Sequence, residues 1–454
     1  MSMHRGVDLS NTATVEEGLQ LLMQEAENLL PAQNVYAFGW EQEKWNRLPE
    51  QDLLDQAFPD RAVIAINSSK SYCWMNQVAQ EKYQFAPDQC SAEARAKLLQ
   101  EMMLDRELVR QEFLNFGGML ARRGVTSIKD IGFDDHNGLL PVLEELEASG
   151  QLPLRVHFAL EPVLQPLNIA TGIEYQERYR GDHLRFQGYK LMVDGVVADH
   201  TGDMLEPYAD MPGVTTLEPV DYEAIETALF EADNHGIKCC LTAEGDAAIH
   251  KAVDMIVRCH QKKDQHTKHS ISDLEYPHPA DLKRMGEHGI FAEVYAQILL
   301  LNPSYEDAYM AVVAGKSNES RFYDYKSMLE ANIPITIGTD LPLFITSVPD
   351  SIYAASFRLF PDGSPTGGWY AEQGMPSCEV LKAWTVNGAK HCGLEKSTGT
   401  LEAGKYADIA VFDRDLLHTP ATDIRDAQVI LTIAGGKITY NQSWSEEEHG
   451  YSQI

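Results

Sequence analysis

Gln187-Gly-Tyr-Lys190-Leu-Met-Val-Asp-Gly195 is an apolar, strand-like run that carries one lysine in its middle and ends at a glycine turn. A lysine is costly to bury unless its charge is removed or paired, and a buried lysine can be chemically active. An edge strand whose lysine reaches solvent is the simpler explanation of this stretch alone. Three later stretches favour a functional site instead: Cys240-Leu-Thr-Ala-Glu-Gly-Asp246, His269-Ser-Ile-Ser-Asp-Leu-Glu275 and Thr336-Ile-Gly-Thr-Asp340.

These stretches lie within a long alternation of strand-like and helical runs that begins at Gly124. The strand-like runs are Val125 to Ile131, Leu154 to Leu160, Phe186 to Val193, Ile237 to Ala243, His269 to Leu274, Ile290 to Ala296 and Ile333 to Gly338. The helical runs are Leu139 to Ser149, Tyr222 to His235, Ala247 to Gln261, Pro279 to Glu287 and Ser320 to Ala331. This order predicts parallel βα units. Gly124, Gly236 and Gly289 precede strands, as helix C-caps do.

The flanking regions predict further elements. Before the alternation, helical spacing covers Thr14 to Leu30, and strands are predicted at Asn34 to Trp40 and Arg61 to Asn67. Ala92 to Arg123 has the spacing of a long amphipathic helical region. After the alternation we predict a helix over Cys378 to Leu394 and a hairpin over Val429 to Tyr440, turning at Gly435-Gly436.

Together these stretches resemble the amidohydrolase superfamily, and within it the amidohydrolase 3 branch, which includes N-substituted formamide deformylases. The stretch Gly399-Thr-Leu-Glu-Ala-Gly-Lys-Tyr-Ala-Asp408-Ile-Ala-Val-Phe-Asp413 is similar to the tail of that family. The resemblance covers about Val7 to Asn441. It implies an α/β fold of the (β/α)8 TIM-barrel type, with chemistry at the C-terminal ends of the strands.

The resemblance also implies a ligand set. In that family a lysine ends the fourth barrel strand, often as a carbamate that bridges two metals, and an aspartate that is ligand and general base ends the eighth. Lys190 and Asp340 match these two positions. The fifth and sixth strands of relatives each end in a metal-binding histidine, where this sequence has Thr242 and Asp273. We therefore expect Asp340 and Lys190 to be catalytic, and Lys190, Asp273 and Asp340 to hold any metal, helped by Glu244 or His200.

Three residues are candidates for substrate binding. His200 lies in a loop that lines the site in relatives, and Thr242 ends a predicted strand. Ser71, in Ser71-Tyr-Cys-Trp-Met-Asn76, stands where relatives have a histidine that helps bind substrate. Buried packing explains Trp74 and Asn76 at least as well.

Relatives bind zinc, manganese or iron, and the donors available in this sequence favour manganese or magnesium over zinc. Neutral threonine is a poor zinc ligand, whereas carboxylates suit oxygen-preferring metals. The family supplies a His-x-His pair from its first barrel strand, and no His-x-His occurs in this sequence. Met3-His-Arg-Gly-Val-Asp-Leu-Ser resembles the sequence that follows that strand. We therefore expect seven barrel strands, without the first, and weak or absent metal binding.

The expected domain organisation is a barrel over residues 1–394, with an insertion at about 30–110, and part of a small β-sandwich over residues 395–454. In relatives, N-terminal strands complete that sandwich. Their absence would leave the strand Ile409 to Phe412 with an unpaired edge, which favours a homodimer.

Composition limits the possible partners. The formal net charge of −31 repels nucleic acids and anionic membranes. No apolar run approaches the roughly 20 residues of a membrane span, and the start lacks an apolar signal region, so we expect a cytoplasmic protein. The seven cysteines are odd in number and form no C-x-x-C pair, which argues against a disulfide framework or a structural zinc site.

Two functions fit these observations. The first is an amidohydrolase-like enzyme that cleaves a carbon–nitrogen bond in a small amide, formamide or cyclic amide by metal-activated water. The second is a metal-poor, catalytically degenerate binding or regulatory protein that keeps the fold. Fold alone does not separate them, because function depends on the site.

Overall fold

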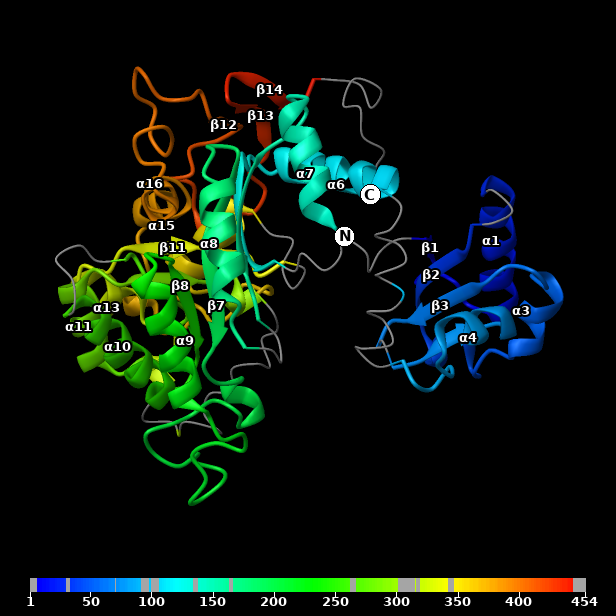
Figure 1. Ribbon diagram of the computed structural model, residues 1–454, viewed down its shortest axis with the longest axis horizontal. Helices are drawn as coiled ribbons and strands as arrows, with labels where there is room; N and C mark the ends of the chain where they lie inside the picture. The colour runs from blue at the N-terminus through cyan, green and yellow to red at the C-terminus, as the bar shows by residue number, and fades with distance from the viewer. Residues whose placement is uncertain are drawn as a thin grey trace. The chain divides into compact units, whose positions relative to one another are not determined.

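The computed structural model describes residues 6–29, 33–69, 71–90, 98, 106–133, 138–162, 166–261, 267–300, 315, 319–341 and 347–443. The chain divides into two compact units (Figure 1). One comprises Met1–Phe116 with Asp135–Glu145, and the other Gly117–Asp134 with Leu146–Ile454. The divisions fall within helices α6 (Arg106–Ala121) and α7 (Leu139–Ala148). α6 confirms the end of the helical region expected over 92–123, whose start lies largely outside the described residues.

The smaller unit contains a four-stranded sheet in the order β1 (Val7–Asp8), β2 (Val35–Trp40), β3 (Val63–Asn67) and β4 (Cys73–Met75). The first three strands are parallel and β4 is antiparallel to β3. Its helices are α1 (Val15–Asn28), α2 (Gln42–Trp45), α3 (Gln51–Ala57) and α4 (Gln77–Tyr83). The two strands and the helix predicted in this region are confirmed.

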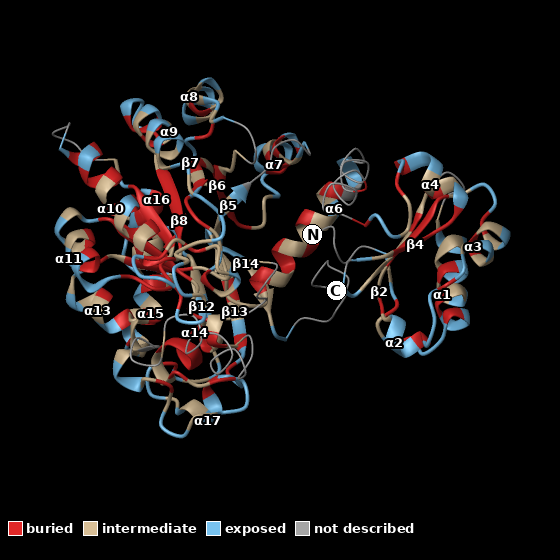
Figure 2. Cartoon of the chain, turned by 90° about the horizontal axis from the view of Figure 1, so that it is seen from below, coloured by how far each residue is buried: buried red, intermediate tan, exposed pale blue. Residues whose placement is uncertain are grey.

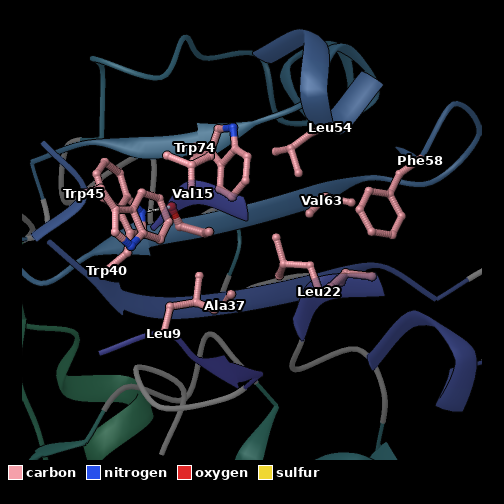
Figure 3. Packing of buried hydrophobic residues seen from close by; sticks show 12 residues of the cluster. Leu9, Val15, Leu22, Ala37, Trp40, Trp45, Leu54, Phe58, Val63 and Trp74 are labelled. Atoms are coloured by element: carbon pink, nitrogen blue, oxygen red, sulfur yellow. Dashed lines mark hydrogen bonds between the residues drawn. The ribbon is translucent and has the colours of Figure 1, made fainter. Parts of the chain in front are cut away.

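Three tryptophans form the centre of this unit's core (Figure 3). The rings of Trp40 and Trp45 stack with their centroids 4.9 Å apart, and Trp74 meets Trp45 edge-on at 5.6 Å. The indole of Trp40 donates to the Ala65 carbonyl at 2.8 Å, so its polar atom is satisfied although the side chain is fully buried. Trp74 is therefore explained by packing.

The larger unit is built on a seven-stranded parallel sheet in the order β11-β10-β9-β8-β7-β6-β5. Its strands are β5 (Ser127–Phe133), β6 (Arg155–Leu160), β7 (Leu184–Met192), β8 (Cys239–Ala243), β9 (Ser270–Asp273), β10 (Phe291–Val294) and β11 (Ile335–Ile337). All seven predicted strands are confirmed in the predicted order. Figure 2 shows the buried strands of this sheet and the exposed outer faces of the helices around it.

The sheet curls on itself, because side chains from well-separated strands meet inside it. The ammonium group of Lys129 on β5 lies 2.6 Å from the carboxylate of Glu293 on β10. His391, from helix α16 (Val386–Cys392), lies 3.1 Å from the same carboxylate. Burial and the charge of Lys129 act on Glu293 in opposite directions, and the charge prevails, so the pKa of Glu293 lies well below its ordinary value.

Helices cover the outside of the curled sheet, with three differences from prediction. The covering helices are α8 (Ile169–Arg178), which was not predicted, α9 (Tyr222–Asn234), α10 (Asp246–His260), α11 (Pro279–His288), α13 (Tyr325–Glu330), α15 (Ser377–Trp384) and α16. The helix expected over 320–331 is shorter, because Tyr323 is left-handed and Asp324 caps α13. The helix expected over 378–394 breaks at Thr385, whose φ of −123° and ψ of −90° are not helical.

A three-stranded antiparallel sheet follows the barrel strands. It consists of β12 (Ile409–Phe412), β13 (Val429–Ala434) and β14 (Lys437–Asn441), with β13 in the middle. The predicted hairpin is confirmed, and both turn glycines, Gly435 and Gly436, have positive φ. Short elements complete the unit: α14 (Val348–Ile352), α17 (Ala421–Ile424), a π-helix (Tyr353–Phe357) and 3-10 turns at Val197–Asp199, Ile298–Leu300, Glu319–Arg321 and Ala371–Gln373. No helix of the described ranges is long and apolar enough to cross a membrane.

Candidate active site

An ion pair lies at the C-terminal end of the sheet, where parallel barrels carry their chemistry. Leu160 of β6 is in register with Tyr189 of β7, so the residues that follow, Glu161 and Lys190, are neighbours. The Lys190 ammonium group is 3.2 Å from the Glu161 carboxylate, and the side chains are 18% and 21% exposed. Sequence analysis missed Glu161, although an acid directly after a predicted strand was a usable signal.

Two predicted aspartates lie at the same end of the sheet. Asp273 is the last residue of β9, and Asp340 follows β11. Both have left-handed backbone conformations, with φ of 68° and 48°. Non-glycine residues in this region carry strain that tends to gather at functional sites. The two carboxyls are close enough for their charges to interact, and the charge of Lys190 acts on both. The structure therefore brings Lys190, Asp273 and Asp340 together.

The titration of these carboxyls reflects a crowded acidic site. Burial, together with the charge of Asp340, raises the pKa of Asp273 to about 7 against the opposing effect of Lys190. Burial also raises the pKa of Asp340 and of Asp130, an additional acid from β5 that the sequence did not indicate. Asp130 and Asp340 keep solvent-exposed surface, and the charge of Lys190 opposes the rise of both pKa values.

Thr242 stands at a position for which the family resemblance implies a histidine. It is buried on β8 and in register with Ser272 on β9. Their hydroxyl groups share a hydrogen bond of 2.8 Å. A hydroxyl has one proton and two lone pairs, so this bond uses part of the capacity that Thr242 could offer a substrate.

The other predicted substrate contacts are engaged elsewhere. The ring of His200 bonds to both oxygens of Asp210, at 2.8 and 3.0 Å, and lies edge-on to Tyr208. Ser71 belongs to the smaller unit, where its hydroxyl bonds to Ser69 at 2.8 Å and to Asn67 at 3.2 Å. A substrate role for either residue stays a prediction.

Glu244, expected as a helper, belongs to a buried acid pair. One of its oxygens accepts a hydrogen bond from the Val197 amide at 3.0 Å. Burial, and after it the charge of the neighbouring Glu275, raises the pKa of Glu244. Glu275 in turn accepts a 2.6 Å bond from the hydroxyl of Tyr323. The first bond fixes the loop after β7 to the end of β8, and the second fixes the end of β9 to Tyr323, which precedes α13.

Another cluster of metal-binding residue types occurs beneath the helices. Asp233, Cys259 and His269 are buried, and one ligand atom from each lies within 4.8 Å of the others. The backbone amide of Cys239 donates to Nδ1 of His269 at 3.0 Å. Nε2 therefore carries the proton and faces the Asp233 carboxylate at 3.2 Å. In this tautomer neither ring nitrogen has a lone pair for a metal, so the cluster is structural.

The donors at the strand ends decide whether they suit the metal that the resemblance implies. Stable zinc sites use three or four closely spaced ligands, mostly cysteine and histidine. Apart from the structural cluster, the described residues contain no three acidic, cysteine or histidine ligand atoms within 4.8 Å of one another. Lys190 is ion-paired with Glu161, and Thr242 is bonded to Ser272. A carbamate-bridged zinc pair does not fit these residues.

Comparison with known proteins gives a consistent family. A family model described as the amidohydrolase family matches residues 1–440. Protein LONG AFTER FAR-RED 3 of Arabidopsis thaliana is 26% identical over 258 residues, which are 56% of this chain and 42% of that protein. An N-substituted formamide deformylase of Arthrobacter pascens is 24% identical over 218 residues, which are 47% of this chain and 38% of that enzyme. The chain thus spans less than half the length of these two curated relatives.

The fold is also found among solved structures. An uncharacterized metal-dependent hydrolase from Pyrococcus horikoshii OT3 superposes with a TM-score of 0.71 at 19% identity. The superposition covers 92% of this chain and 83% of that one. At this identity the likeness establishes the common fold.

Proposed function

The chain belongs to the amidohydrolase family, and on this premise we propose that it hydrolyses a carbon–nitrogen bond in a small amide, formamide or cyclic amide. The observation that carries the proposal is the convergence of Lys190, Asp273 and Asp340 at the C-terminal end of the sheet. Carboxyls with raised pKa values beside a cation are the groups that acid–base catalysis requires. The formamide deformylase among the relatives supports the choice of substrate class.

The residues divide the reaction between them. Asp340 keeps exposed surface, so it can take a proton from a water molecule that attacks the carbonyl carbon. Lys190 faces the oxygen on which negative charge develops. The carbon–nitrogen bond then breaks, the proton passes from Asp340 to the leaving nitrogen, and acid and amine are the products. Because a zinc pair does not fit, no step is assigned to a metal.

The test compares the wild-type protein with Asp340→Asn on a panel of simple amides. The panel contains N-benzylformamide, N-benzylacetamide and a cyclic imide, and released amine or acid is followed by nuclear magnetic resonance. We expect hydrolysis of at least one compound, and a loss of roughly 100-fold or more in Asp340→Asn, because the amide is nearly isosteric but cannot act as a base. The unfolding midpoint should be unchanged.

Glu174→Gln is the matched control, because Glu174 is an exposed acid on α8 whose nearest basic group is 3.9 Å away. It removes one negative charge outside the site and should leave the rate unchanged. If the wild-type protein hydrolyses nothing on the panel, the hydrolase proposal fails, and the binding or regulatory alternative gains support.

Several finer features belong to the same proposal. We propose that the β12–β14 sheet is part of a small β-sandwich. We also propose that the protein acts in the cytoplasm on a small molecule, without nucleic acid or membrane partners. None of the seven cysteines forms a disulfide, as is usual in a reducing compartment.

A further inference from the structure

We propose that Glu161 is a positioning residue that holds Lys190 as an unmodified ammonium group, which contacts the substrate carbonyl oxygen directly. This inference rests on the proposed hydrolase function and assigns a role that sequence analysis did not give to Glu161. Its basis is the 3.2 Å ion pair between Glu161 and Lys190 at the end of β6 and β7.

The position of Glu161 is built into the sheet. The register of β6 with β7 places it beside Lys190. On its other side lies Gly132 of β5, where a side-chain Cβ would be 3.3 Å from the second carboxylate oxygen of Glu161. That separation is tighter than most van der Waals contacts, so the lack of a side chain at Gly132 leaves room for the carboxylate. Glu161 is thus held between β5 and Lys190.

Several carboxyls interact with the charge of Lys190. Besides Glu161, the carboxyls of Asp130, Asp273 and Asp340 all interact with the charge of Lys190. Several charged groups act strongly on these three aspartates. Among those of the described residues, Lys190 is the one cation. The interaction of Lys190 with each of these four carboxylates is attractive.

A carbamate at Lys190 would reverse these interactions. Carbamylation removes the positive charge and places a negative group among four carboxyls. Like charges a few ångströms apart in a partly desolvated site repel strongly. In relatives of the implied type, two metal ions neutralise that charge, but the donors here do not suit such a pair. The unmodified ammonium group is the form compatible with these neighbours.

An ammonium group in this place has a defined use in amide hydrolysis. When water adds to the carbonyl carbon, the carbonyl oxygen becomes negatively charged. A positioned N–H donor with a formal charge stabilises that oxygen more than it stabilises the ground state. Glu161 keeps the donor in place but does not touch the substrate, so removing Glu161 should reduce kcat more than it raises KM.

The chemical state of Lys190 can be measured without any substrate. The wild-type protein and Lys190→Ala are equilibrated with isotope-labelled bicarbonate, and carbonyl signals of carbamates are compared by nuclear magnetic resonance. We expect every carbamate signal of the wild-type protein to remain in Lys190→Ala, so that none is assigned to Lys190. Such a signal would overturn the proposal whether or not the enzyme is active.

The positioning role needs a second measurement, the kinetics of Glu161→Gln and Glu161→Asp on the best amide of the panel. We expect kcat to fall roughly tenfold or more in Glu161→Gln, with partial recovery in Glu161→Asp, which keeps the charge. Glu174→Gln is again the charge-matched control. A purely structural ion pair would instead lower the unfolding midpoint and leave kcat unchanged, which would overturn the proposal.

The two measurements test the inference independently of each other. A wild-type protein with no activity on any amide would refute the catalytic contact together with the proposed function, while the carbamate experiment still decides the state of Lys190. A protein that is active but carries a Lys190 carbamate would keep the proposed function and refute this inference.

Discussion

The chemistry of the site depends on single residues at strand ends. Thr242 and Asp273 stand where the family resemblance implies histidines, and Glu161 lies beside the lysine for which it implies a carbamate. These residues change the site from one that suits zinc to one rich in carboxyls. Lys190 is the cation that balances them.

Restoring the histidines should restore zinc binding. In the double variant T242H/D273H, two imidazoles and Asp340 would supply three ligands, so we expect about one zinc per chain after dialysis. The wild-type protein should retain far less, and each single variant should be intermediate. Elemental analysis of the purified proteins measures this, with circular dichroism to check folding. Equal zinc content in the wild-type protein and the double variant would contradict the ligand argument.

The sequence indicated Asp273 and Asp340 because each lies near the end of an apolar run, and Lys190 because it lies within one, and the family resemblance implies a site at these positions. Asp130 and Glu161 escaped prediction because their approach to Lys190 depends on the stagger between β5, β6 and β7. That stagger includes irregularities at Asp130/Phe133 and Phe158/Ala159. A shift of one residue would turn either side chain to the opposite face, and an apolar pattern does not reveal such shifts.

Whole elements were more predictable than their ends. The seven strands are apolar runs bounded by polar or glycine positions, so their existence followed from pattern alone. The helices over 320–331 and 378–394 were predicted too long, because the backbone breaks at Tyr323 and Thr385 come from tertiary context. Helix α8 was missed altogether, although Asn168 caps its start by accepting from the Thr171 amide at 3.3 Å.

The bulge in β7 aims Lys190, and Gly188 makes that bulge possible. Its φ is +107°, and an added Cβ would lie 2.0 Å from the carbonyl oxygen of Lys238. Gly188→Ala should therefore lower the free energy of unfolding by about 3 kcal/mol or more, through both strain and overlap. Gly213→Ala separates these causes, because Gly213 has φ of +84° with nothing within 4 Å.

Urea unfolding of both glycine variants provides the measurement. Gly213→Ala should cost only about 1 kcal/mol, the strain of a positive φ alone. If the two variants are equally stable, the close approach of β7 to Lys238 does not constrain the strand.

At the scale of the whole molecule, the edge of β12 is the first feature with consequences. Among the described residues β12 pairs only with β13, so its other edge has free backbone groups. Val411 on this strand is 38% exposed. We predict concentration-dependent dimerisation through this edge, measured by analytical ultracentrifugation.

A lysine on the edge strand should weaken this association. Val411→Lys places a charge where the second chain would approach, and charged edges block strand pairing. Leu417→Lys is the control, because Leu417 is 46% exposed and outside the strands. A wild-type protein that stays monomeric at high concentration would refute the prediction.

The stability of the larger unit should depend on pH through two opposing sets of buried groups. Burial lowers the pKa of His391 to about 4 and of His157 to about 3, from 6.5. As pH falls below 6.5, the unfolded chain binds these protons and the folded chain does not, so stability is lost. Burial raises the pKa of Asp194 and Asp273 to about 7, and it also raises that of Glu244. The folded chain binds these protons first, so their stabilisation is present at low pH and is lost as pH rises towards 7.

Between about pH 5 and 6.5 the carboxyls whose pKa values are raised by burial outnumber the two histidines, and Asp130 and Asp340 add to their number. The free energy of unfolding should therefore rise on acidification, by roughly 1.4 kcal/mol per pH unit for each proton that the folded chain binds in excess of the unfolded chain. The net charge of −31 acts in the same direction, because protonation relieves self-repulsion.

His391→Gln removes one opposing group, so the free energy of unfolding of this variant should rise more steeply on acidification. Urea unfolding at several pH values measures this. High salt should remove the contribution of self-repulsion to the pH dependence but leave the contribution of the buried groups. Stability that instead falls steadily below pH 6.5 would mean that the histidines dominate and that the acids at the strand ends are ionised in the folded protein.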